Sequence, residues 1–222
     1  MERNSVITKC YRCGAAGVTR EHYPPRCLFP EGYRDRLTTV PSCQEHNNAH
    51  SLDVEYVKQF ILMQEGINTV GKRHLMNNGV ETFLHSPGLL RHVEREMKEV
   101  AFDPELLAIP LDLQRFETVM EAIAYAVHFN DFNRAYSGTW RIFSPNLASV
   151  STHLEGHATD GWEEYRYQVL NAPYAPSITP HPRVFKYGLH LFEEDKLLYR
   201  FDFYEGFVVT ALSAPASVRV TD

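Results

Sequence analysis

The chain has 222 residues, of which 44% are hydrophobic and 23% are charged, and this balance is typical of a globular protein and excludes a disordered one. No apolar run approaches the length of a transmembrane helix, and the first residues lack the apolar core of a signal peptide. We therefore expect a cytoplasmic protein with no membrane contact. The net charge of −6 excludes a protein that coats DNA with its whole surface.

The charge is unevenly spread along the sequence. Residues 1–42 contain seven basic and four acidic residues, a balance of +3, which leaves −9 for residues 43–222. A small basic head on an acidic body suits a local site that contacts phosphate groups.

The first predicted elements are two short strands and a helix. Residues 18–22 (VTREH) and 36–40 (RLTTV) are short and rich in β-prone side chains. Ser42 and Glu45 then have the spacing of a capping box, directly after Pro41, which predicts a helix with Cys43 in its first turn. The segment therefore predicts the order strand, strand, helix.

Two pairs of metal-ligating residues stand before and after the two predicted strands. Cys10 and Cys13 form a C-x-x-C pair, and Cys43 and His46 form a second pair with the same two-residue spacer. Such spacers let two side chains reach one tetrahedral ion, so the four residues predict a structural zinc site rather than disulfides. Cys27 is the rival fourth ligand, but it has no partner at short spacing and we interpret it as a small packed hydrophobe.

Residues 53–136 are expected to be helical. A helix is predicted from Ser51, a second from the N-cap pair Ser86 and Pro87, and a third from Asp112. The apolar positions at helical spacing are Val54, Val57 and Ile61 in the first, Leu90, Val93, Met97 and Val100 in the second, and Leu113, Phe116, Val119, Met120, Ile123 and Val127 in the third.

The C-terminal part has a different pattern. From about Gly138 the chain is rich in Pro, Gly and Ser, and two aromatic, β-prone runs follow at 184–192 and 197–209. The charged turn EEDK separates the runs, which predicts a β-hairpin. The fold class is therefore α+β, with helices followed by a small C-terminal antiparallel sheet.

The N-terminal motifs resemble the HNH, or ββα-metal, endonuclease superfamily. The matching residues are CYRCG at 10–14, the E-H-x-x-P of Glu21, His22 and Pro25, and C-x-x-H-N-x-x-H from Cys43 to His50. A narrower resemblance, to bacterial HNH proteins with C-terminal extensions, covers residues 10–57. The chain departs from that group at His46, where Cys is usual, and at Asp35 or Arg36, where Asn is common.

The resemblance implies roles for the remaining polar residues of this segment. His22 would be the general base, because a neutral imidazole can accept a proton from water near pH 7. Glu21 and Asn47 would hold a catalytic divalent ion such as Mg²⁺, which prefers oxygen ligands. His50 would be a third ligand or a phosphate contact. Arg20 and Arg26 would bind the phosphates that flank the cleaved bond.

Three ranges follow from these observations: a zinc-containing ββα nuclease unit at 1–52, a helical region at 53–137 and a β-rich region at 138–222. The alternative division joins 53–222 into one accessory domain. We predict a metal-dependent HNH endonuclease that hydrolyses phosphodiester bonds in DNA, with RNA as the alternative substrate and with 53–222 as the candidate surface for a protein partner. The alternative is a non-catalytic zinc-knuckle module that recruits a partner through its acidic body. The joint presence of Glu21, His22 and Asn47 favours the enzyme.

Overall fold

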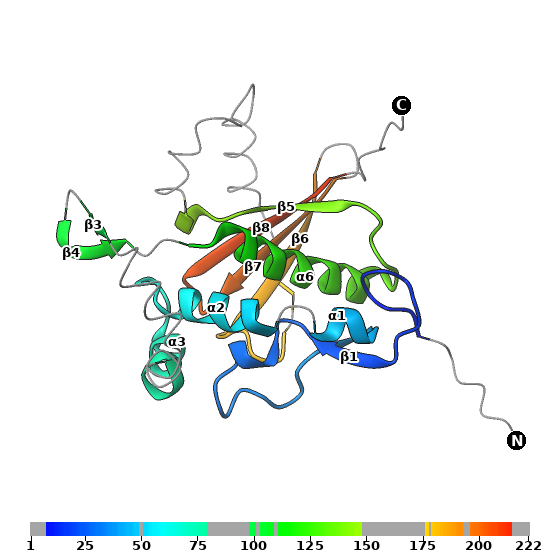
Figure 1. Ribbon diagram of the computed structural model, residues 1–222, viewed down its shortest axis with the longest axis horizontal. Helices are drawn as coiled ribbons and strands as arrows, with labels where there is room; N and C mark the ends of the chain where they lie inside the picture. The colour runs from blue at the N-terminus through cyan, green and yellow to red at the C-terminus, as the bar shows by residue number, and fades with distance from the viewer. Residues whose placement is uncertain are drawn as a thin grey trace, which may run out of the picture.

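The computed structural model describes residues 8–48, 51–79, 98–100, 103–108, 111–147, 176–177, 179–192 and 196–214, and these residues form a mixed α+β protein (Figure 1). The predicted fold class is confirmed at this level, since helices precede a small antiparallel sheet. None of the helices in the described ranges has the combination of length and apolarity that crossing a membrane needs.

The sheet has four antiparallel strands in the order β5-β8-β7-β6. Their bounds are Thr139–Phe143 for β5, Phe185–Phe192 for β6, Lys196–Phe203 for β7 and Phe207–Ala214 for β8. The predicted hairpin is confirmed, because β6 pairs with β7 from Phe185↔Phe203 to Phe192↔Lys196. The prediction of one β-prone run at 197–209 is wrong, because β7 ends at Phe203 and β8 begins at Phe207.

A tight turn divides that run into β7 and β8. Tyr204 and Glu205 both have positive φ, at 52° and 57°, and the Gly206 amide donates to the Phe203 carbonyl over 3.2 Å. The turn is held from outside, since the Tyr204 amide donates to the Val184 carbonyl at 2.9 Å. Tertiary contacts therefore override the extended preference of these side chains.

The long helix α6, Leu113–Phe132, lies across the sheet (Figure 1). The predicted start is confirmed: Asp112 is the N-cap and its carboxylate accepts from the Arg115 amide at 3.2 Å. Its apolar stripe is buried, and the helix contacts β5 and β8 of the sheet as well as α2 and β2.

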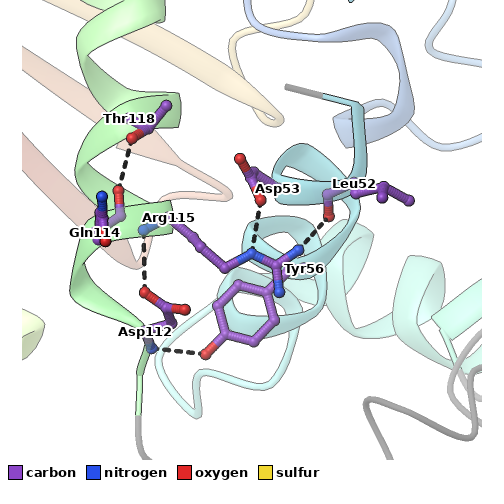
Figure 2. Close-up of polar contacts among 7 residues, drawn as sticks. All are labelled: Leu52, Asp53, Tyr56, Asp112, Gln114, Arg115 and Thr118. Atoms are coloured by element: carbon purple, nitrogen blue, oxygen red, sulfur yellow. Dashed lines mark hydrogen bonds and ion pairs between the residues drawn. The ribbon is translucent and has the colours of Figure 1, made fainter. Parts of the chain in front are cut away.

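Helix α2, Ser51–Leu62, begins one residue before the prediction, which made Ser51 its N-cap. Its first turn is bound to α6 through Arg115, whose Nε donates to Asp53 Oδ1 at 2.6 Å and whose Nη2 donates to the Leu52 carbonyl at 3.0 Å (Figure 2). The same guanidinium lies 4.5 Å from the centre of the Tyr56 ring, and the Tyr56 hydroxyl accepts from the Asp112 amide at 2.8 Å. We call these five residues the α2–α6 clamp.

Beyond α2, the helix α3, Thr69–His74, is capped by Asn68 and continues as a short π-helix at Leu75–Gly79. The helix predicted from Ser86 to Val100 falls mostly outside the described residues. Its last residues are not helical, because Lys98–Val100 form β3, which pairs with β4, Asp103–Ala108. That pairing supplies the backbone hydrogen bonds that a final helical turn would otherwise make.

The N-terminal part has two antiparallel strands and a short helix. Strand β1, Thr19–His22, pairs with β2, Thr39–Ser42, and α1, Gln44–Asn48, follows. The prediction for β2 was about three residues early, because Arg36 has a positive φ of 53° and still lies in a turn. Cys43 precedes the helix rather than lying in its first turn, and the Ser42 hydroxyl donates to the Cys43 carbonyl at 3.0 Å.

One large cluster of buried side chains connects these elements. It includes Tyr11 and Leu28 from the N-terminal part, Phe116 from α6, and Phe201 and Phe207 from the sheet. Residues of all three predicted ranges thus contribute to one core, and the division into 1–52, 53–137 and 138–222 stays a prediction.

Candidate metal centre and active site

Residues 8–17 fold back on themselves and place the first ligand pair at the tip of a turn. Lys9 bridges Ala16, and the Cys10 amide donates to the Ala15 carbonyl at 2.7 Å. The Gly14 amide donates to the Cys10 carbonyl at 3.0 Å, and Gly14 has a φ of +73°, which glycine adopts without strain. This turn directs Cys10 and Cys13 toward the second pair.

The second pair comes from the junction between β2 and α1. Cys43 follows β2 directly, and His46 lies one turn further along α1. The Tyr11 amide donates to the Pro41 carbonyl at 2.9 Å, and this bond holds the first turn beside β2.

The four side chains meet at one point. Their ligand atoms all lie within 4.8 Å of one another, with Cys13 Sγ 3.9 Å from Cys43 Sγ and Cys10 Sγ 3.6 Å from His46 Nδ1. A tetrahedral zinc ion would hold two sulfurs about 3.8 Å apart, and a sulfur and a nitrogen about 3.6 Å apart. Cys10, Cys13, Cys43 and His46 therefore form a group that could hold one tetrahedral metal ion.

The environment of Cys10 suits a thiolate. Burial alone would raise the pKa of Cys10. Hydrogen bonds with the backbone of Cys13, Arg12 and Cys43 and with the His46 side chain outweigh this effect and lower the pKa to about 6. Backbone donors stabilise the charged sulfur, and the thiolate is the form that binds metal.

Cys27 lies apart from this group. Burial, and then the neighbouring Glu55 carboxylate, raise the pKa of Cys27 to about 12. A thiol that stays protonated makes a poor metal ligand, so the structure agrees with the interpretation of Cys27 as a packed residue.

Glu21 and Asn47 are brought together by β1 and α1. One atom of the Asn47 amide lies 2.7 Å from Glu21 Oε2 and 3.0 Å from the Arg20 carbonyl oxygen. Hydrogen bonding favours nitrogen at that place, because the amide then donates to both oxygens. A cation would be held with the amide turned the other way, so that its oxygen faces the Glu21 and Arg20 oxygens.

The Glu21 carboxyl group is desolvated. Burial raises its pKa to about 7, and Glu21 forms no ion pair with any cationic side chain in the described part of the chain. A buried carboxylate of this kind is costly unless it gains a compensating charge. Glu21 and the Arg20 carbonyl, with the Asn47 amide turned to present its oxygen, are residues that could hold a hard cation.

His22 is the last residue of β1 and lines the same cavity as Glu21 and Asn47. Burial, and then the charges of Arg26 and Arg20, lower the pKa of His22, which favours the neutral imidazole. Arg20 is fixed across the hairpin, where its Nε donates to Thr39 Oγ1 at 2.7 Å and its Nη2 to the Thr39 carbonyl at 3.1 Å. His50 lies outside the described residues.

The candidate residues line a cavity of about 310 Å³. Its lining includes Glu21, His22, His46 and Asn47. Other lining residues come from parts of the chain that sequence reasoning did not assign to the site, namely Ser51, Val54 and Glu55 of α2 and Val119, Ala122, Ile123 and Ala126 of α6, and Tyr11, Tyr23, Pro25 and Cys27 complete the lining. The helical stripe identified Val119 and Ile123 as inward-facing, but nothing in the sequence indicated what they face.

No family model matches the chain, and no curated protein and no solved structure was found to be similar to it. The chemistry of the site is therefore argued from its own residues.

Proposed function

We propose that this protein is a metal-dependent endonuclease of the HNH kind that hydrolyses phosphodiester bonds in DNA. The observation that carries the proposal is the contact between Asn47 and Glu21 in a cavity that His22 also lines. A binding module would need neither a desolvated carboxylate nor a neutral histidine at the same place.

Zinc is proposed at Cys10, Cys13, Cys43 and His46 as a structural ion. Asn47 directly follows His46 on α1, so an ion that fixes His46 against the Cys10 turn also fixes where Asn47 meets Glu21 of β1. The order β1, β2, α1 around this ion supports the interpretation as a ββα-metal unit. Zinc would thus contribute to folding and to the geometry of the second site.

A divalent cation such as Mg²⁺ is proposed at Glu21 and Asn47, with the Arg20 carbonyl as an additional oxygen. When bound, it would stabilise the charge that develops on the phosphate and on the leaving 3′ oxygen. His22 would take the proton from the attacking water, and Arg20 and Arg26 would orient the flanking phosphates. His50 stays a candidate for a further ligand or a phosphate contact.

The test is metal-dependent nicking of supercoiled plasmid by the purified full chain. Nicking that needs Mg²⁺ or Mn²⁺ and stops with EDTA supports the endonuclease. Absence of cleavage on DNA and RNA across divalent metals would favour the non-catalytic zinc module that recruits a partner through residues 53–222.

A further inference from the structure

The candidate catalytic residues line a cavity that is partly open to solvent. Glu21, His22 and Asn47 share its lining with Val54 of α2 and Ile123 of α6. A substrate that enters this cavity therefore also meets the wall that these two helices contribute.

The wall that α2 and α6 contribute is held rigidly. The α2–α6 clamp joins the first turns of both helices through Arg115, Asp53 and Tyr56 (Figure 2). Further along, the rings of Phe60 on α2 and Phe116 on α6 meet edge to face with centroids 6.4 Å apart. Since Phe116 and Ile123 are almost fully buried in the common core, the wall cannot move away without opening that core.

The size of the cavity limits what it can admit. About 310 Å³ is at the lower end of pockets that bind a single small molecule. In-line hydrolysis requires the phosphorus and both adjoining sugars to approach the metal and the base together. In a duplex those sugars carry paired bases, and the second strand would meet α2 and α6.

Basic side chains near the cavity suit the backbone of a single strand. The basic residues Arg20 and Arg26 are exposed beside His22, where they can contact the flanking phosphates of a strand.

We infer that the substrate is single-stranded DNA, or an unpaired stretch within a duplex, because the wall formed by α2 and α6 excludes paired strands from the cavity that holds Glu21, His22 and Asn47. This inference rests on the proposed nuclease function and names its substrate class.

The experiment compares the full-length protein on three end-labelled DNA substrates of the same sequence: a single strand, a blunt duplex, and a duplex with a central unpaired loop. Cleavage of the single strand should be faster than that of the duplex by about tenfold or more, as expected when a steric barrier rejects one substrate. The looped duplex should be cut within its loop. Equal or faster cleavage of the blunt duplex would overturn the inference and leave the nuclease function intact, whereas no cleavage of any substrate would overturn both.

A pair of variants tests whether the wall itself sets this limit. Ala122→Phe places a ring in the cavity from a half-exposed position of α6, and Gln114→Phe places the same ring on an exposed position of α6 that does not line the cavity. With zinc content and melting temperature matched to wild type, Ala122→Phe should lose single-strand cleavage and Gln114→Phe should keep it. Full activity of a folded Ala122→Phe protein would overturn the assignment of the substrate path. If Ala122→Phe fails to fold, Val119→Ala, which widens the cavity, should raise the relative rate on the blunt duplex, and an unchanged ratio would overturn it.

Discussion

His74 Nδ1 lies 2.8 Å from the hydroxyl oxygen of Tyr204 in the buried interior. The Tyr204 hydroxyl donates its proton to the Leu28 carbonyl, so His74 must be the donor in its own contact with Tyr204. The chain of bonds joins α3, the β7–β8 turn and the segment that follows His22. A distant part of the sequence therefore anchors the loop beside the candidate site.

The state of His74 makes stability depend on pH. Burial, and then the charges of Lys58 and Arg34, lower the pKa of His74 to about 4, whereas an unfolded histidine titrates near 6.5. Between these values the unfolded chain binds a proton that the folded protein excludes, so the contribution of His74 is present above pH 6.5 and is lost as the pH falls toward 4. The loss should amount to roughly 2–3 kcal/mol.

Chemical denaturation of wild type and His74→Leu at several pH values checks this prediction. The gap in unfolding free energy between the two proteins should be widest at pH 7 and should narrow by pH 4.5. The comparison cancels other groups that titrate in both proteins. A gap that stays constant across this range would show that His74 keeps an ordinary pKa.

The β7–β8 turn should be intolerant of a side chain at Gly206. A Cβ there would lie 2.1 Å from the Gly66 carbonyl oxygen, so Gly206→Ala must separate the turn from the loop between α2 and α3. We expect Gly206→Ala to cost about 3 kcal/mol or more. Gly32→Ala is the matched control, because Gly32 has a φ of +86° but open space around it, and its cost should be only about 1 kcal/mol. Equal melting temperatures for the two variants would contradict the packing described.

The α2–α6 clamp should contribute measurably to stability. Arg115→Ala removes the ion pair with Asp53, the bond to Leu52 and the contact with the Tyr56 ring, at an expected cost of about 1–2 kcal/mol. Arg36→Ala is the control, because the Arg36–Asp35 pair is largely exposed and should contribute almost nothing. Thermal unfolding measures the stability that each variant loses. Similar losses for Arg115→Ala and Arg36→Ala would show that the clamp contributes no more than an exposed ion pair.

The structural metal is tested by zinc content. The purified protein should contain about one equivalent of zinc, and Cys43→Ala should lose it together with folding, because structural zinc contributes folding free energy directly. Cys27→Ser should keep the metal, since Cys27 lies outside the ligand group. Zinc retained in Cys43→Ala and lost in Cys27→Ser would show that the wrong cysteine has been assigned.

Local patterns in the sequence were sufficient for several parts of this structure. Two spacers of two residues predicted the group of Cys10, Cys13, Cys43 and His46, because short-range geometry alone decides how such pairs converge. Helix α6 and the β6–β7 hairpin were also predicted, since Asp112 and the charged turn before Lys196 are strong local signals.

Features set by tertiary contacts were beyond reach. Tyr204 and Glu205 form a tight turn without the Asn-Gly pair that such turns favour. They are held there because the Tyr204 carbonyl accepts from the Asn68 amide at 2.8 Å and the Asn68 side chain donates to Glu205 at 2.8 Å. The cavity escaped prediction for the same reason: helical spacing identified the inward face of α6 but not that it shares a cavity with Glu21 and Asn47.

The central claim is that His22, Glu21 and Asn47 together hydrolyse phosphodiester bonds. Substitutions of these residues should lower the cleavage rate for different reasons. Asn47→Ala should weaken binding of the catalytic metal, so that added Mg²⁺ or Mn²⁺ partly restores the rate. His22→Ala removes the base, and extra metal should not restore its rate.

The most direct measurement is the rate of metal-dependent DNA cleavage by wild type and by His22→Ala, with zinc content and melting temperature measured on the same preparations. The account predicts that His22→Ala stays folded and keeps zinc but cleaves about a hundredfold more slowly or worse, the usual contribution of a positioned base. Wild-type rates from a folded, nuclease-free His22→Ala preparation would contradict it.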